Sequence, residues 1–268
     1  IYNNVSEMLD SNAVGVSASG AGVTAIAANV NANIITNATK AILAANVLNS
    51  NSISVSASDL TQAAERNLLV AGTGGTSGLG GVVTVDVMDK TTEAKISSQE
   101  VSSNGDITVN AKSENAFGAQ KDSDGKYIEK AIGNISKIIE ESEQAGGTEK
   151  LDSMAYWQYG INGCGAATVG INETVIVKDI KNHISAIIDG TNIKKSNGVK
   201  ATVSDYTINN VLLGSIQGSG MFSMGGGEYI NILSSDNSAK ILSGTKINSN
   251  GDIVVNAENK EVLRDIVA

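Results

Sequence analysis

The sequence repeats itself at an interval that restricts the fold more than any other feature does. Residues 101–111 and 247–257 share the run Asn-Gly-Asp-Ile at their centre, and weaker copies lie at 51–57 and 197–203. One aliphatic marker position recurs in all copies, as Ile53, Ile107, Val199 and Ile253. Its intervals are 54, 92 and 54 residues, so the longer one is a repeat plus an insertion of about 38 residues. Such a period predicts units that stack on one another.

The segment around each marker alternates between small or aliphatic residues and mostly polar ones. Ile53, Val55 and Ala57 are separated by Ser54 and Ser56, and the other copies keep the same phase. Period-two alternation places successive side chains on opposite faces of a β-strand. The pattern therefore predicts strands with one dry and one wet face, which bury a shared core only when the units stack.

Two repeat architectures have units of about this length, the β-propeller and the β-solenoid. Propeller blades carry aromatic signatures and hairpins, whereas aromatic residues make up only 3% of this chain. The chain has no proline, which indicates long stretches of uninterrupted backbone hydrogen bonding. We therefore predict an all-β fold, a parallel β-helix (β-solenoid), in which residues 1–268 form one domain of four units. If each unit makes three coils of about 18 residues, roughly 13 coils give an axis of about 60 Å.

Glycine-rich stretches accompany the units, at residues 15–22, 72–81, 160–170 and 214–227. Glycine tolerates positive φ and close approach of another backbone, so we expect corners there. The stretch at 72–81 also resembles a phosphate-binding loop in its glycine content. It lacks the Gly-Lys-Ser/Thr ending, and no βαβ pattern surrounds it, so corner or loop glycines are the better interpretation.

The insertion, residues 121–151, breaks the alternation. Its apolar residues recur at helical spacing, at Ile128, Ala131, Ile132, Ile135, Ile138 and Ile139. Asp122 and Asp124 open it with N-cap chemistry, and their spacing does not match an EF-hand loop. The pattern predicts one inserted amphipathic α-helix of about 18 to 20 residues. It either packs on the flank or an exposed edge of the solenoid, or it decorates the surface as a binding element.

An aromatic cluster, Tyr156, Trp157 and Tyr159, follows the insertion. Aromatic side chains at a surface can contact a sugar or a protein, so these three residues are the candidate binding surface. The alternative interpretation is that they pack beneath the inserted helix, because its apolar face needs an apolar surface to pack against.

Residue types that carry catalysis are scarce. His183 is the single histidine and Cys164 the single cysteine, so the chain can form neither an internal disulfide nor a His/Cys zinc site. His183 falls in the polar phase of its segment and is predicted to be solvated, while Cys164 is predicted to be a small buried or semi-buried residue. We predict no catalytic residues, no metal site and no cofactor.

The net charge of −9 argues against nucleic acid and against anionic membranes, because both attract basic proteins. No apolar stretch approaches the roughly 20 residues that cross a bilayer. The chain begins at Ile1 without the features of a signal peptide, and we interpret it as an internal fragment of a longer protein.

Segments such as Gly81-Val-Val-Thr-Val-Asp86 and Asn104-Gly-Asp-Ile-Thr-Val-Asn-Ala111 resemble repeats of large bacterial exoproteins. These are the filamentous-haemagglutinin and leukotoxin-type filamentous adhesins. The resemblance implies a right-handed parallel β-helix forming a secreted, surface-associated shaft. It also implies export through an outer-membrane transporter, by a two-partner or autotransporter route. Members act as adhesins that contact host cells, through protein or glycan, and some are toxins toward host leukocytes. The family offers no catalytic residues.

Three functions remain open on the sequence. The leading one is a non-catalytic adhesin or leukotoxin shaft segment at the bacterial cell surface. The second is a polysaccharide-degrading β-helix enzyme, which would need carboxylates that converge in a cleft. The third is a structural spacer, with all binding carried elsewhere in the parent protein.

Overall fold

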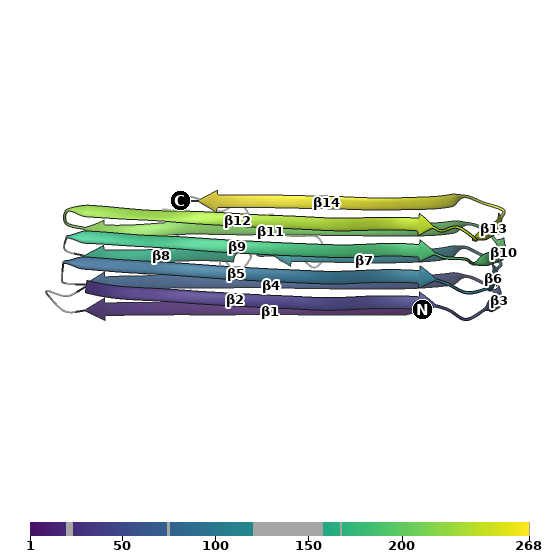
Figure 1. Ribbon diagram of the computed structural model, residues 1–268, viewed down its shortest axis with the longest axis horizontal. Helices are drawn as coiled ribbons and strands as arrows, with labels where there is room; N and C mark the ends of the chain where they lie inside the picture. Colours follow the sequence, from purple (N-terminus) through teal and green to yellow (C-terminus); the bar gives the residue numbers. More distant parts are fainter. Residues whose placement is uncertain (20–23, 74–75, 120–157, 167, 268) are drawn as a thin grey trace.

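The computed structural model describes residues 1–19, 24–73, 76–119, 158–166 and 168–267. These residues form fourteen β-strands and no helix, and Figure 1 shows the strands lying side by side along the long axis of the molecule. The strands are β1 (Tyr2–Ser19), β2 (Thr24–Leu43), β3 (Val47–Ser50), β4 (Ile53–Thr73), β5 (Ser77–Ile96), β6 (Glu100–Ser103), β7 (Ile107–Phe117), β8 (Gln158–Ala166), β9 (Val169–Ile188), β10 (Asn192–Ser196), β11 (Val199–Ser219), β12 (Phe222–Ile241), β13 (Lys246–Ser249) and β14 (Ile253–Val267).

Each repeat unit contributes to three parallel sheets in turn. Sheet A contains β1, β4, β7 with β8, β11 and β14; sheet B contains β2, β5, β9 and β12; sheet C contains β3, β6, β10 and β13. The chain runs through A, B and C and returns to A in the next unit, and the pairings within the three sheets are parallel. The all-β prediction with parallel strands is therefore confirmed.

The strand register follows the sequence repeat. Ile53 pairs with Ile107, Ile107 with Val199, and Val199 with Ile253. These are the marker residues of the repeat. The 54-residue spacing is thus the length of chain in one turn, after which the chain forms a strand that pairs with the equivalent strand of the preceding unit.

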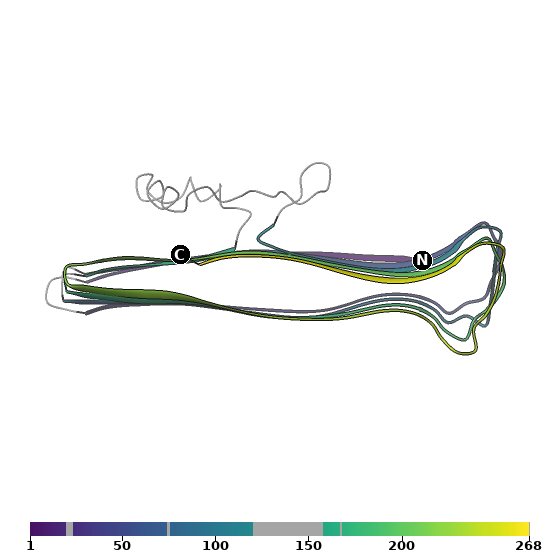
Figure 2. The same cartoon turned by 90° about the horizontal axis from the view of Figure 1, so that it is seen from above.

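The prediction of three short coils per unit is wrong, because one unit makes a single turn. In the second unit the strands have 21, 20 and 4 residues. A strand of that length extends about 65 Å, whereas the five levels of sheet A span only about 20 Å at 4.8 Å each. The molecule is accordingly long in the strand direction, as Figure 2 shows. Alternation alone could not reveal this, because it looks the same within one long strand and across several short ones.

A strand of sheet A ends within each glycine-rich stretch, at Ser19, Thr73, Ala166 and Ser219, and the next strand of sheet B begins three to five residues later. The predicted corners therefore lie at these stretches. Among the described glycines, positive φ occurs at Gly118, Gly190 and Gly244, which lie outside the stretches, so the expectation of positive φ there is not met by the described glycines. Close approach is nevertheless required at Gly160, where a Cβ atom would lie 2.7 Å from Cγ2 of Thr174 in the facing sheet. There the two sheets leave no room for a side chain.

Sheets A and B face each other along most of the molecule, and sheet C closes one end (Figure 2). Near sheet C the interior is aliphatic and includes the marker residues Ile53, Ile107 and Val199. On β7, Ile107 and Val109 are fully buried, while Thr108 between them is partly exposed. The prediction of a dry and a wet strand face is confirmed there.

The insertion interrupts one strand of sheet A. β7 ends at Phe117 and β8 begins at Gln158, yet both pair with the same two neighbours, β4 and β11. The predicted helix at 121–151 lies outside the described residues.

Candidate functional site

The aromatic residues predicted as a binding surface are only partly described. Tyr156 and Trp157 lie outside the described residues. Tyr159 belongs to β8, where its backbone pairs with Arg66 on one side and with Leu212 on the other. A binding surface at this cluster remains a prediction, located where the insertion rejoins sheet A.

The single histidine and cysteine lie on different strands. His183 is exposed on β9, as predicted, and pairs in register with Thr91 and Asp236. Cys164 lies in β8, next to Ala71 and Gln217 in the register. Within the described part of the chain, no group of three or more His, Cys, Asp or Glu residues could hold a metal ion. The same residues contain no helix long and apolar enough to cross a membrane.

Ion pairs on the outer surface connect successive units. Nζ of Lys95 lies 2.8 Å from Oδ2 of Asp189, and Nζ of Lys194 lies 2.6 Å from Oε2 of Glu100. Because these groups are partly exposed to solvent, each pair contributes about 0–1 kcal/mol. The outer surface thus carries charged side chains that match from unit to unit.

The most distinctive site lies inside the molecule. Beyond the aliphatic end, the inward positions of both sheets carry buried polar and charged side chains: Thr39, Asp59, Thr61, Lys90, Asn115, Lys178, Asn182, Asp205, Thr207 and Asn209. Sequence reasoning missed these residues because it assigned inward positions from aliphatic segments alone. The signal was present, since Asp59 and Thr61 continue the phase of Ile53, Val55 and Ala57.

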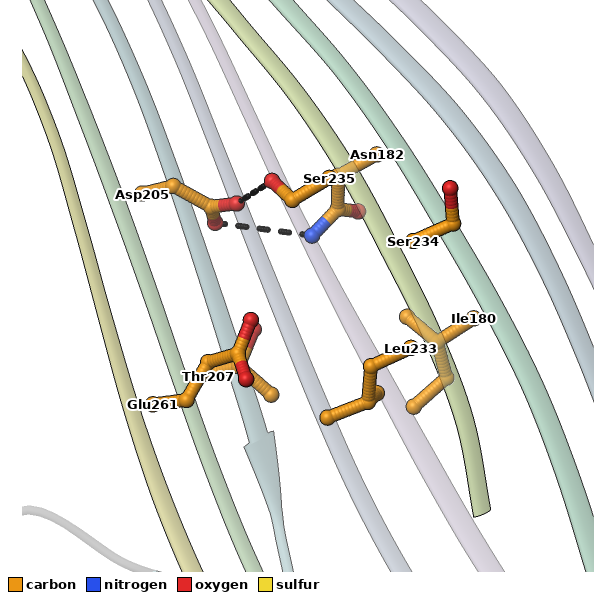
Figure 3. A pocket seen from close by; sticks show the side chains of 8 residues that line it. All are labelled: Ile180, Asn182, Asp205, Thr207, Leu233, Ser234, Ser235 and Glu261. Atoms are coloured by element: carbon orange, nitrogen blue, oxygen red, sulfur yellow. Dashed lines mark hydrogen bonds between the residues drawn. The ribbon is translucent and has the colours of Figure 1, made fainter.

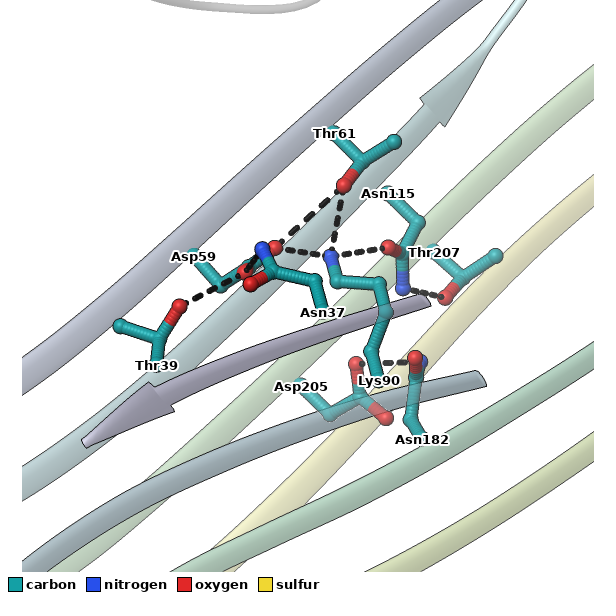
Figure 4. A network of polar contacts seen from close by, with 9 residues as sticks. All are labelled: Asn37, Thr39, Asp59, Thr61, Lys90, Asn115, Asn182, Asp205 and Thr207. Atoms are coloured by element: carbon teal, nitrogen blue, oxygen red, sulfur yellow. Dashed lines mark hydrogen bonds and ion pairs between the residues drawn. The ribbon is translucent and has the colours of Figure 1, made fainter. Parts of the chain in front are cut away.

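Lys90 of β5 is the centre of the first polar cluster (Figure 4). Its Nζ donates hydrogen bonds to Oγ1 of Thr61 at 2.8 Å and to Oδ1 of Asn115 at 2.9 Å. It also forms an ion pair with Asp59, and both side chains are only 1% exposed. In turn, Nδ2 of Asn115 donates to Oγ1 of Thr207 at 3.2 Å, which fixes the orientation of the amide.

The Asp59 carboxylate is held from several directions. It accepts hydrogen bonds from Nδ2 of Asn37 at 2.6 Å and from Oγ1 of Thr39 at 3.0 Å. Burial lowers the pKa of Lys90, while the charge and hydrogen bond of Asp59 oppose that shift. The cluster therefore places a lysine whose neutral form is favoured by burial between a carboxylate and a carboxamide.

A second cluster has the same three residue types. Nζ of Lys178, on β9, lies 3.2 Å from Oδ1 of Asn209 and 3.7 Å from Oδ2 of Asp86. The Lys178 ammonium also lies 4.4 Å from the centroid of the Phe117 ring. In both clusters a lysine of sheet B meets an asparagine of the next unit in sheet A.

A small hollow opens where β12 and β14 border the interior (Figure 3). Its cavity volume is about 10 Å³, and its lining includes Asp205, Asn182, Ser235 and Glu261. Asp205 accepts hydrogen bonds from Nδ2 of Asn182 at 3.4 Å and from Oγ of Ser235, and burial raises the pKa of its carboxyl. Small-molecule sites commonly enclose roughly 300–1,000 Å³. The hollow is thus smaller than a polysaccharide-cleaving cleft requires, although two carboxylates line it.

Comparisons with known proteins leave the chain without an assigned family. No family model and no curated protein matches it. One solved structure, the tapirin C-terminal domain of Caldicellulosiruptor kristjanssonii, aligns with this chain at 8% identity and a TM-score of 0.06. The alignment covers 76% of this chain and 53% of that one. A score this low carries no argument about fold or function.

Proposed function

We propose that the chain is a non-catalytic shaft segment of a secreted bacterial adhesin or leukotoxin-type exoprotein, wound as a right-handed β-helix. The observation that carries the proposal is the register, in which equivalent residues of successive units pair in three parallel sheets. A right-handed path is expected, because connections between parallel strands of one sheet take that hand in about 98% of cases.

The outer surface supports a role in contact rather than in chemistry. Long strands carry charged pairs between units, such as Lys95 with Asp189 and Lys200 with Asp106. Each added unit would lengthen a shaft by about 4.8 Å. On this proposal the protein is exported through an outer-membrane transporter and held at the cell surface, where the insertion and the aromatic cluster contact a host protein or glycan.

A structural spacer is the second candidate, and the interior favours it. Lys90, Asp59 and Asn115 connect three strands of two facing sheets across the core. Such contacts hold the two faces of a shaft together but do not reach a ligand outside. The two candidates differ only in whether this segment itself binds cells.

A deletion that removes the insertion and preserves the register distinguishes them. Gly118 donates its backbone N–H to the carbonyl oxygen of Ala63 at 2.7 Å, and Phe117 pairs with Asn209 while Gln158 pairs with Val211. Joining Gly118 directly to Gln158 therefore places one residue opposite Asn210 and keeps β7 and β8 in line. The variant lacks residues 119–157.

The fluorescently labelled chain and this variant are compared by flow cytometry on leukocytes and epithelial cells, with circular dichroism as the control for folding. Saturable binding by the chain that the folded variant loses is the expected result for an adhesin. Absence of binding by both proteins contradicts the adhesin proposal for this segment and leaves the spacer. Equal binding by both would move the contact surface from the insertion to the sheet faces.

A further inference from the structure

The Lys90 cluster brings together the three groups needed to form an amide bond between side chains. Nζ of Lys90 is 2.9 Å from Oδ1 of Asn115, the oxygen bonded to the carboxamide carbon. The Asp59 carboxylate contacts the same Nζ. The three groups are shielded from bulk solvent, since Lys90 and Asp59 are 1% exposed and Asn115 is 0% exposed. The hydrogen bond from Asn115 to Thr207 holds the amide in place.

We propose that Lys90 and Asn115 form an intramolecular isopeptide bond, with Asp59 as the catalytic proton acceptor. The ammonium of Lys90 first transfers a proton to the Asp59 carboxylate. The neutral amine then attacks Cγ of Asn115, and the C–Nδ2 bond breaks as the attacking nitrogen passes a proton to the departing nitrogen. The products are a secondary amide, one molecule of ammonia and a protonated Asp59, so atoms and charge balance without an oxidant or a co-reactant.

The surroundings of the Lys90 cluster favour formation of the amide bond over its reversal. The reaction begins with a buried ammonium and a buried carboxylate, whose removal from water is costly even when they are paired, and it ends with neutral groups. Burial also disfavours the charged form of the lysine, and the neutral amine is the nucleophile. An apolar cluster including Met88 and Phe117 lies next along the two sheets, two residues from Lys90 and from Asn115.

The bond would fasten sheet B of one unit to sheet A of the next through the interior. β5 carries Lys90 and β7 carries Asn115, and these strands belong to different sheets. Neither sheet could then separate from the other near this point without breaking a covalent bond. A shaft under tension gains resistance from such a link.

Lys178 provides an internal comparison. Its Nζ lies 3.2 Å from Oδ1 of Asn209, but the carboxylate of Asp86 is 3.7 Å away and the ammonium stacks on Phe117. The carboxylate is not in hydrogen-bond contact with this amine, and the ring stabilises the charged form. We expect Lys178 to remain unreacted under conditions in which Lys90 reacts.

The test is the intact mass of the purified 268-residue chain, followed by a tryptic digest. The expected mass is lower than the sequence mass by one ammonia. The digest should contain a branched peptide that joins residues 67–95, uncleaved after Lys90, to residues 113–121. Because both measurements use the unaltered chain, they do not depend on the folding of a variant. A full sequence mass together with normal cleavage after Lys90 overturns the proposal.

Variants then identify the partners. Lys90→Arg keeps the charge and removes the nucleophile, so the mass loss should disappear, whereas Lys178→Arg should retain it. Asp59→Asn should also abolish the loss. Loss of water instead of ammonia, with Lys90 joined to Asp59, would overturn the assignment of Asn115, and an ammonia loss that persists in Lys90→Arg would overturn the assignment of Lys90.

Discussion

Two regions of the interior differ in chemistry although the same strands build both. Near sheet C, β4 and β7 point aliphatic residues such as Val55 and Val109 into a dry core. Further along the same strands, in the same alternating phase, the inward residues are Asp59 and Asn115. Aliphatic residues need only a space of the right shape, whereas buried polar residues need partners in the facing sheet. The position of a residue in the strand alternation therefore decides whether its side chain is buried. The facing sheet decides which side chains can be buried there, because a polar one needs a partner.

The largest effect should come from introducing a charge into the aliphatic region. Val109→Asp buries a carboxylate with no cation nearby, which should cost more than about 4 kcal/mol and prevent cooperative folding. The adjacent change Thr108→Asp, on the partly exposed face, should alter the unfolding free energy by less than about 0.5 kcal/mol. Urea unfolding followed by circular dichroism measures both. Equal effects would mean that the two strand faces do not differ in burial.

In the polar region, removing one charge should be more harmful than removing both. Lys90→Met removes both the proposed link to Asn115 and the only cation paired with Asp59 among the described contacts, and it should cost at least about 3–5 kcal/mol. The double variant Lys90→Met with Asp59→Leu should recover the part of that loss that comes from the unpaired carboxylate, because no unpaired charge remains. Lys95→Met, which breaks a surface pair, should cost less than about 1 kcal/mol. Unfolding free energies of the four proteins check this order, and a double variant no better than Lys90→Met contradicts it.

A third comparison concerns the space between the sheets. Gly160→Ala places a Cβ against Thr174 and should cost about 1–3 kcal/mol through overpacking. Gly81→Ala meets nothing within 4 Å and should instead stabilise the chain by about 0.5–1 kcal/mol, because alanine loses less entropy in a strand. Thermal unfolding of both variants would show opposite shifts in Tm. Shifts in the same direction would mean that the spacing near Gly160 adjusts freely.

The smallest effect should be the pH dependence carried by Asp205. Its folded-state pKa is raised above its usual value of 3.8 by burial, so the folded chain binds this proton more tightly than the unfolded chain does. Asp205 therefore contributes a loss of stability as pH rises from about 3.8 through the raised pKa. Asp205→Asn should lack this loss, so the unfolding free energy of the variant should improve relative to wild type across that interval. Urea titrations at several pH values test the sign, and a constant difference contradicts it.

The repeat predicted the register well and the path of the chain poorly. Ile53, Ile107, Val199 and Ile253 could be aligned from the sequence and are paired in the sheets. The single long turn per unit could not be predicted, since a 21-residue strand such as β4 alternates like several short ones. The Lys90 cluster was also missed, because Lys90 and Asn115 belong to different strands and become partners only when sheets A and B face each other.

The sequence by itself determined the strand phase, the 54-residue register and the point where the insertion interrupts a unit. Those properties depend on alternation and repetition, which are local and written along the chain. Only the tertiary structure decided how far each strand extends, where the sheets approach as closely as at Gly160, and which polar residues satisfy one another inside. These properties depend on contacts between residues of different strands, and the free energy of a buried charge is set by whichever group the fold places opposite it.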